Sequence, residues 1–249
     1  MLTIDLEKLE IPNGSVILDL GCGKGRHLHK LYYFSKCHVV GLDLSIEELK
    51  VTYQGFEQYP DISEEKERKF SLMAGTAIKL PFKDNSFDNI ICSEVLEHIE
   101  DFEKVIKEIY RISKPGAKIG ISVPRWLPEK ICWALSEDYH NEPGGHIRIF
   151  RFKNLRNAFT KNGFVYLGKN FKHGLHSPYW WLKCLVGVKK ENNILVNLYK
   201  RFLEWDIIDR PLTTRLLEKI FDPILSLIHI SEPTRLLSIS YSVFCVKKK

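Results

Sequence analysis

The sequence has two methionines, no C-x-x-C pair and no apolar run of the about 20 residues that a membrane-spanning helix needs. Met1 opens a polar stretch, so no secretory leader is expected. No histidine or cysteine spacing is typical of a metal site. The six cysteines are expected to be reduced thiols, which favours a cytoplasmic chain. They stand at positions 22, 37, 92, 132, 184 and 245.

A large excess of charge of one sign is also missing. The formal net charge is +6, and residues 225–249 hold four basic residues and one acidic residue. The other 224 residues therefore carry 33 basic and 30 acidic groups. These nearly equal numbers leave no excess of basic residues of the kind that binds nucleic acid, so a nucleic-acid partner is not expected. The chain has 249 residues, of which 44% are hydrophobic, enough for one large domain with an ample core.

Three glycines alternate directly after the apolar run 16–20, in the stretch Gly21-Cys22-Gly23-Lys24-Gly25. Glycine adopts positive φ without steric cost, and its missing Cβ lets a ligand approach the backbone. A helix that follows such a turn offers unpaired N–H groups to an anionic group. The pattern predicts a strand, a tight turn and a helix that together bind a nucleotide-type ligand.

The spacing of these glycines separates the turn from a dinucleotide fingerprint. G-x-G-x-x-G needs glycine or alanine at position 26, where this chain has Arg26. A second apolar run, 39–42, ends in Asp43, whose carboxylate could accept bonds from both ribose hydroxyls of an adenosine. Asp43 could instead serve as a turn or capping residue. Arg26 makes a nicotinamide-dependent dehydrogenase a poor alternative.

The remaining pattern predicts an α/β fold. Strands are expected at 15–20, 38–43, 70–73, 87–92, 118–123 and 164–171, and helices at 25–34, 46–57, 102–113 and 155–161. Such alternation is typical of a parallel sheet covered on both faces. Residues 172–224 are rich in aromatics, with helical character near 193–204 and 213–221, and are interpreted as a cap-like insertion of the same domain.

Five ordered motifs carry a family resemblance: ILDLGCGKG (17–25), GLDLS (41–45), LPF (80–82), FDNIICSEVLEHI (87–99) and KPG (114–116). Residues 10–125, and loosely up to 171, resemble class I S-adenosylmethionine-dependent methyltransferases, most closely the ubiquinone and menaquinone biosynthesis group. The resemblance implies a Rossmann-like, doubly wound, mostly parallel seven-stranded sheet, with the S-adenosylmethionine-binding domain at 1–171. It also implies methyl transfer to a small acceptor, quinone-like or otherwise apolar.

The resemblance assigns residues to the cofactor. The three glycines would lie against its methionine and ribose, Asp19 would orient its amino group, and Asp43 would bind the ribose. Thr76 stands where relatives often carry an acidic residue for adenine, so the backbone of Ala77 is the alternative contact. The full cofactor set is Asp19, Gly21, Cys22, Gly23, Gly25, Asp43, Leu44, Thr76, Ala77, Ser93 and Glu94.

Residues for the acceptor are fewer. His98 lies where many relatives keep a histidine, and is either a general base or a structural histidine bonded to backbone. His146 and Arg148 follow a Gly-Gly turn and either reach the acceptor or lie in a solvated loop. Trp180 and Trp181 either line an apolar acceptor pocket, touch a lipid surface by peripheral membrane contact, or simply bury within the cap. An RNA- or protein-directed methyltransferase and a non-catalytic cofactor-binding protein remain alternative functions.

The sequence at the end of the chain differs in origin from the rest on our interpretation. Residues 225–235, LSLIHISEPTR, match residue for residue the translation of a transposase-type sequencing adapter, and 239–246 resemble the next adapter segment. We therefore predict that 225–249 are a non-native tail, with the native last strand lost or replaced. The alternative is that 239–246 are a genuine last strand, because their apolar residues alternate at strand period.

Overall fold

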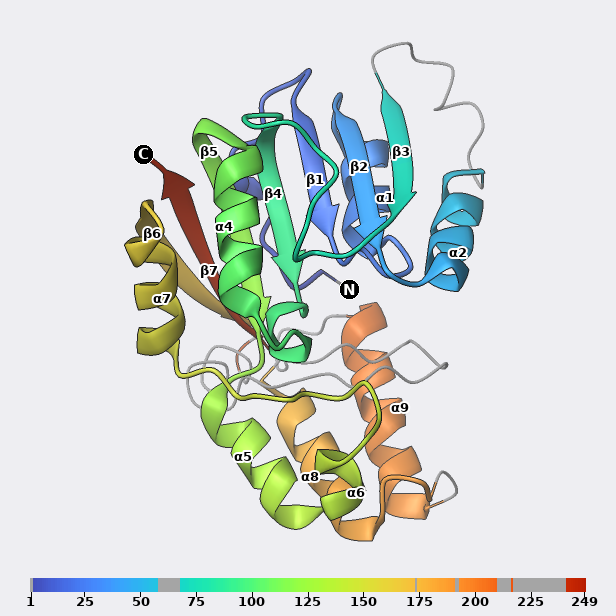
Figure 1. Cartoon of the computed structure of the whole chain (residues 1–249). Coiled ribbons are helices and arrows are strands. Elements are labelled where there is room, and N and C mark those ends of the chain that lie inside the picture. Colours follow the sequence, from blue (N-terminus) through green and yellow to red (C-terminus); the bar gives the residue numbers. More distant parts are fainter. Residues whose placement is uncertain (1, 58–67, 173, 191–192, 210–215, 217–240) are drawn as a thin grey trace. The chain divides into compact units, whose positions relative to one another are not determined.

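The computed structural model describes residues 2–57, 68–172, 174–190, 193–209, 216 and 241–249 (Figure 1). Its contacts divide the chain into two units, which are treated separately below. The sheet unit comprises residues 2–122, 156–168 and 244–249. The helical unit comprises residues 123–155 and 169–243.

The described strands form one sheet of seven, in the order β3-β2-β1-β4-β5-β7-β6. The pairs β1–β2, β1–β4, β2–β3 and β4–β5 are parallel. The order reverses between β1 and β4, and ligands of open α/β sheets bind beyond the carboxyl ends of strands at such a switch point. The expected Rossmann-like, mostly parallel seven-stranded sheet is confirmed. Its strands are β1 Val16–Leu20, β2 His38–Asp43, β3 Lys69–Ala74, β4 Phe87–Ser93, β5 Ser113–Val123, β6 Phe164–Lys172 and β7 Tyr241–Lys248.

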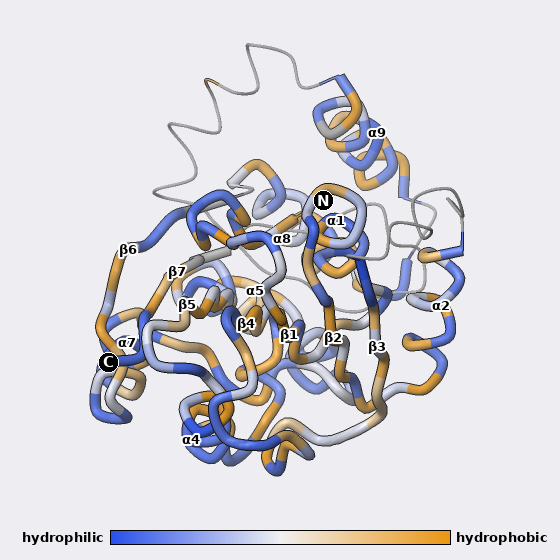
Figure 2. Tube along the Cα trace, turned by 90° about the horizontal axis from the view of Figure 1, so that it is seen from above, coloured by the Kyte–Doolittle hydropathy of each residue, from blue (hydrophilic) through white to orange (hydrophobic). Residues whose placement is uncertain are grey.

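Helices α1 (Arg26–Phe34) and α4 (Phe102–Ile112) cover opposite faces of this sheet (Figures 1 and 2). The apolar stripe of α4, which includes Val105, Ile109 and Ile112, is fully buried. Helix α2 (Ile46–Glu57) begins where the Ser45 hydroxyl accepts a hydrogen bond from the N–H of Glu48, so Ser45 is its N-cap. Shorter elements are the 3-10 turns Glu7–Leu9 and Leu96–His98, and α7 is Phe152–Lys161.

Strand β7 lies between β5 and β6, and runs opposite to β5 (Figure 1). Its carboxyl end meets the amino end of β5, since Lys248 Nζ donates to the Ser113 carbonyl at 2.8 Å. Phe244 and Val246 are buried in the sheet unit. A strand lies at 241–248, near the range 239–246 of the alternative expectation, and its being the native last strand stays a prediction. The adapter origin of 225–249 stays a prediction, and 217–240 lie outside the described residues.

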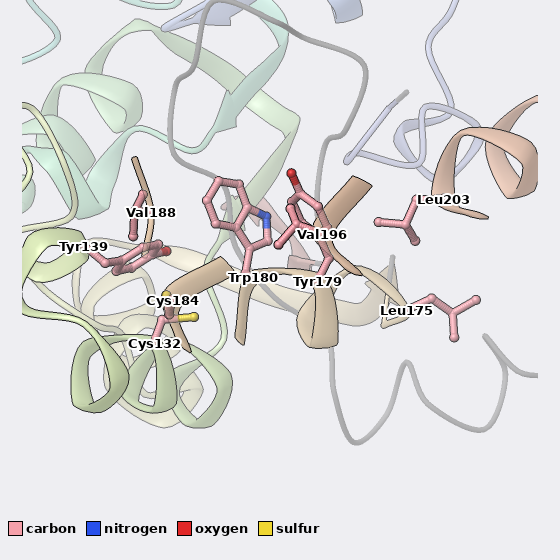
Figure 3. Close-up of a cluster of buried hydrophobic side chains, with 9 residues drawn as sticks. All are labelled: Cys132, Tyr139, Leu175, Tyr179, Trp180, Cys184, Val188, Val196 and Leu203. Carbon is pink, nitrogen blue, oxygen red and sulfur yellow. The ribbon is translucent and has the colours of Figure 1, made fainter. Parts of the chain in front are cut away.

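The helical unit contains α5 (Trp126–Leu135), α6 (Glu137–His140), α8 (His176–Val186) and α9 (Ile194–Asp209). Figure 3 shows its core, in which Cys132 of α5 and Cys184 of α8 lie side by side. Helices α5 and α6 precede residue 172, so this unit begins earlier than the cap expected from the sequence. The expected helix at 213–221 lies, apart from Leu216, outside the described residues.

The aromatic pair of the helical unit points mainly inward. Trp180 is 3% exposed, and the half-buried Trp181 donates its Nε1–H to the Pro128 carbonyl at 3.3 Å. The burial alternative for these tryptophans is therefore confirmed for Trp180. No described helix is long and apolar enough to cross a membrane.

Candidate active site

The glycine turn is fixed to the end of β2. The N–H groups of Gly21 and Cys22 both donate to the Leu42 carbonyl, at 2.7 and 3.2 Å. All three glycines have positive φ: 70° at position 21, 51° at 23 and 77° at 25. A Cβ on Gly21 would lie 2.3 Å from Val95 Cγ2, so packing excludes a side chain there. At Gly23 the nearest such atom is Glu48 Oε2 at 3.4 Å, so this position is open enough for a ligand to approach.

Asp43 ties the turn to the next helix. Its Oδ2 accepts the N–H of Gly23 at 2.7 Å, and its Oδ1 accepts the N–H of Ser45 at 2.9 Å. The turn role that competed with ribose binding is therefore present. The two roles are compatible, because each carboxylate oxygen keeps a second lone pair for an external hydroxyl.

Asp19 is a buried carboxyl at the end of β1, and 1% of it is exposed. Neither of its oxygens has a hydrogen-bond partner among the described residues. Burial raises its pKa to about 7, opposed by Arg26 and assisted by Asp43. His27 Nδ1 lies 3.8 Å from Asp19 Oδ2, and burial keeps the pKa of His27 well below its usual value, so it does not neutralise the carboxylate. A buried carboxylate without donors is costly, which fits a site whose donor comes from a ligand.

Polar side chains meet at the carboxyl ends of β4 and β5. Ser93 Oγ lies 2.7 Å from the hydroxyls of both Thr3 and Ser122. Arg26 forms an ion pair with Glu94 and also donates from its guanidinium to Ser93 Oγ at 3.3 Å. Glu94 itself has a φ of 60°. The position that breaks the dinucleotide fingerprint thus carries a cation anchored beside the switch point. Thr3 was missed from sequence because its partners lie 24 and 90 residues away.

Apolar side chains are exposed past the ends of β2 and β3. Leu44 is 74% exposed and Ile78 is 42% exposed, while Ala77 is buried. The register pairs Asp43 with Ala74, which places Leu44 and Gly75 at adjacent positions of neighbouring strands. Exposed aliphatic groups at this edge are suited to a flat aromatic ring. The Thr76 hydroxyl accepts a long bond of 3.4 Å from the Ile78 N–H and carries no charge.

The acceptor candidates lie in different units. His98 of the sheet unit is exposed, at the end of the 3-10 turn Leu96–His98, and its N–H donates to the Val95 carbonyl at 3.1 Å. His146 of the helical unit is 5% exposed, so the solvated-loop interpretation is wrong for this residue. Its Nδ1 lies 2.7 Å from Oε1 of the fully buried Glu129, which explains why it turns inward. Arg148 is half-buried, over the ring of Phe150.

Sequence reasoning missed Glu129 and Tyr139, which complete a buried triad with His146. The Tyr139 hydroxyl donates to Glu129 Oε2 at 3.2 Å. An ionised carboxylate only accepts, so the Nδ1–H of His146 donates to Glu129. Burial and the Glu129 charge raise the pKa of Tyr139 well above its usual value, so its hydroxyl remains a donor. No sequence motif marks Glu129. Its helical spacing was the only signal that could have indicated it.

Comparison with known proteins adds independent evidence. Residues 11–175 match the family model described as a methyltransferase domain. Sterol 24-C-methyltransferase of Aspergillus fumigatus is 30% identical over 142 residues, covering 57% of this chain and 34% of that protein. Norajmaline N-methyltransferase of Rauvolfia serpentina is 40% identical over 108 residues, covering 42% of this chain and 34% of that protein. The chain thus spans about a third of the length of these two curated relatives.

Solved structures agree on the fold. One solved structure is of a protein from Galdieria sulphuraria that is described as a sarcosine dimethylglycine methyltransferase. It has a TM-score of 0.62 at 18% identity, over 98% of this chain and 81% of that one. A [4+2]-cyclase has a TM-score of 0.59 at 16% identity, over 97% and 78%. The same fold therefore supports more than one reaction, and family membership rests on the sequence match. With its glycine turn, acidic strand ends and a family match across residues 11–175, this chain belongs to the methyltransferase-domain family.

Proposed function

We propose that this chain binds S-adenosylmethionine beside its glycine turn and transfers the methyl group to a small apolar acceptor. The observation that carries the proposal is the buried carboxylate of Asp19 next to that turn, whose oxygens accept no hydrogen bond from any residue that the structure describes. The ammonium group of a methionine supplies the donors and the positive charge that this carboxylate lacks. Membership in the methyltransferase-domain family supports the same ligand.

The other residues at this edge fit the rest of the cofactor. The ribose hydroxyls would take the remaining lone pairs of Asp43, and the adenine would lie against Leu44. Thr76 and the Ala77 N–H would bind its edge. Near the carboxyl ends of β1 and β4, the methionine part would lie against the backbone of Gly21, Cys22, Gly23 and Gly25, with Ser93 and Glu94 beside it.

The cofactor supplies an electrophilic methyl carbon on a sulfonium. The protein then has to hold donor and acceptor in line and exclude water. A nucleophile that carries a proton also needs a base. His146, whose Nδ1 lies 2.7 Å from Glu129 Oε1, is the first candidate for that base. His98 remains a second candidate base, and Arg148 a cation for an acceptor that carries negative charge.

An apolar acceptor is favoured over a macromolecule. The two curated relatives described above are named for a sterol and for norajmaline. Residues 1–224 are nearly balanced in charge, which does not favour RNA. A quinone-like acceptor belongs to the same apolar class. A cofactor-binding protein without catalysis would keep the glycine turn and Asp43 but would need no buried base.

Asp19→Asn is expected to stabilise the unliganded protein and weaken cofactor binding at the same time. The raised pKa means that the folded chain binds more protons than the unfolded chain between about pH 4 and about pH 7, so the free energy of unfolding falls by about 4 kcal/mol as pH rises through that window. The amide of Asp19→Asn does not titrate, so in this variant the free energy of unfolding does not fall in that way. Thermal unfolding at pH 5 and pH 8 and calorimetric titration with S-adenosylmethionine at pH 8 measure both effects.

Asp88→Asn is the matched control for that substitution. Asp88 pairs with Lys114 and accepts the Val16 N–H, and these contacts lower its pKa. Its substitution should destabilise the fold at pH 8 and leave cofactor affinity unchanged. Full affinity in Asp19→Asn, or lower stability than the unmodified chain at pH 8, would contradict the proposed role of Asp19.

Gly23→Ala should lower cofactor affinity by at least about tenfold, because the methyl group would occupy space that the ligand needs. Gly14→Ala provides the control, since Gly14 also has positive φ, at 78°, and has no atom within 4 Å of an added Cβ. Both variants carry the left-handed strain of about 1–2 kcal/mol, so their unfolding midpoints should fall together. Equal cofactor affinity in the two variants would place the ligand elsewhere.

Transfer itself is tested with methyl-labelled S-adenosylmethionine and a lipid extract, followed by mass identification of the labelled product. Asp43→Ala should bind the cofactor about 10- to 100-fold more weakly, as expected for lost bonds to a charged acceptor, and should lose label at sub-saturating cofactor. Tight binding without any labelled product would support the non-catalytic alternative. Label in RNA or protein would overturn the small-molecule acceptor.

His146→Gln should slow methyl transfer by about 10²- to 10⁴-fold and leave cofactor affinity intact. Glu129→Gln should give a smaller loss and a shifted pH profile, because its amide can donate to Nδ1 and move the histidine proton to Nε2. His140→Gln is the control, since His140 stacks on Trp133 in the same unit without contacting Glu129 in any described hydrogen bond. An unchanged rate in His146→Gln together with a loss in His98→Gln would assign the base to His98.

A further inference from the structure

Aliphatic side chains gather, exposed, where α8 ends and α9 begins. Leu185 in the last turn of α8 is 66% exposed. In the first turns of α9, Ile194 is 82% exposed, Leu195 60% and Leu198 64%. The segment between the helices adds the exposed Lys189 and Lys190. These six residues are called the α8–α9 tip.

The exposed face continues along α9 as a stripe. Trp205 is 44% exposed and Ile208 is 76% exposed. Positions 194, 198, 205 and 208 lie within one face of a helix with 3.6 residues per turn. Figure 2 shows hydrophobic and hydrophilic residues alternating along this helix. Exposed apolar residues therefore recur on this face over several turns of α9, with the exposed Arg201 among them.

The opposite face of α9 is already occupied. Val196 and Leu203 are buried in the core of the helical unit, which Figure 3 shows. The Tyr199 hydroxyl donates to the Leu175 carbonyl at 2.9 Å. One face of α9 thus packs into the core of the helical unit. The exposed stripe is a second apolar face, separate from the face that forms the core.

Charge is distributed unevenly along the same segment. Residues 183–201 contain five basic residues, of which Lys183 is buried, and one acidic residue, whereas 202–209 contain three acidic residues, of which Asp206 is buried, and no basic one. The acidic residue of the first group, Glu191, lies outside the described residues. Arg201 lies on the apolar face of α9 and is exposed. The amino end of α9 is therefore the basic end, and it coincides with the α8–α9 tip.

We propose that the α8–α9 tip docks on the surface of an anionic lipid bilayer. Aliphatic side chains inserted below the headgroups and lysines placed at their phosphates form the combination that interfacial helices use. Long lysine stems can lie along apolar surface while the ammonium reaches the phosphates. This charge complementarity favours an anionic bilayer over a neutral one. The docking is independent of methyl transfer, and would bring the chain to the phase where apolar acceptors dissolve.

The test is co-sedimentation of the full chain, without cofactor or acceptor, with phosphatidylcholine vesicles that contain or lack phosphatidylserine. The unmodified chain should prefer the anionic vesicles. Ile194→Glu/Leu198→Glu should reduce binding by at least about tenfold. Lys189→Gln/Lys190→Gln should lose about fivefold for each lysine on anionic vesicles only. Phe34→Glu/Val51→Glu, at residues 72% and 41% exposed on α1 and α2, is the matched control and should bind normally.

Thermal unfolding of each variant separates lost docking from lost folding, and Ile194→Gln/Leu198→Gln replaces the charged pair if that pair does not fold. No binding by the unmodified chain, or unchanged binding by Ile194→Glu/Leu198→Glu, would overturn the proposal. Light scattering that shows a dimer, dispersed by the same variant with vesicle binding unaffected, would assign the patch to a second copy instead. None of these readouts depends on the cofactor site, so the docking can fail while the proposed methyl transfer stands.

Discussion

The two bonds that Asp43 accepts hold the proposed site together. One carboxylate at the end of β2 fixes the glycine turn through Gly23 and the start of α2 through Ser45. The turn is fixed a second time by the Leu42 carbonyl, which accepts two N–H groups from it. The protein's own hydrogen bonds therefore fix the shape of the turn that we propose as the cofactor site. Such preorganisation reduces the ordering cost of binding, and it leaves Asp19, rather than the turn, as the group that still needs a partner.

The sheet unit was largely predictable because its signals are local. Buried parallel strands give continuous apolar runs, and glycine turns give positive φ, so 38–43 and 46–57 were expected with the bounds that β2 and α2 have. The cofactor edge followed from the rule that parallel strands end together. Thr3 was not predictable, since nothing near it in sequence indicates that its hydroxyl would contact Ser93.

The helical unit was predicted less well, for a physical reason. Helix α5 contains a proline and a mixture of aromatic and polar residues, and α6 has only four residues, so neither shows a clear apolar period. Glu129 could be recognised only once packing placed it against His146 and Tyr139. His146 itself was found from its glycine turn, but its burial was not. The helical character expected near 193–204 is confirmed by α9 (Ile194–Asp209), although apolar residues on both of its faces blur the period that identifies an amphipathic helix.

The strand order has a consequence for how this sheet assembles. The strands β3, β2, β1, β4 and β5 come from one continuous stretch of chain, residues 16–123, whereas β6 reaches them only through β7. β6 therefore joins the sheet only through a segment about 70 residues further along the chain, and that segment lies within the predicted non-native tail 225–249. β7 covers the β5 edge and is anchored there by the Lys248 ammonium at the Ser113 carbonyl. Without β7 this edge would present free backbone groups, which would make it the place where a chain lacking that strand is most exposed to mispairing.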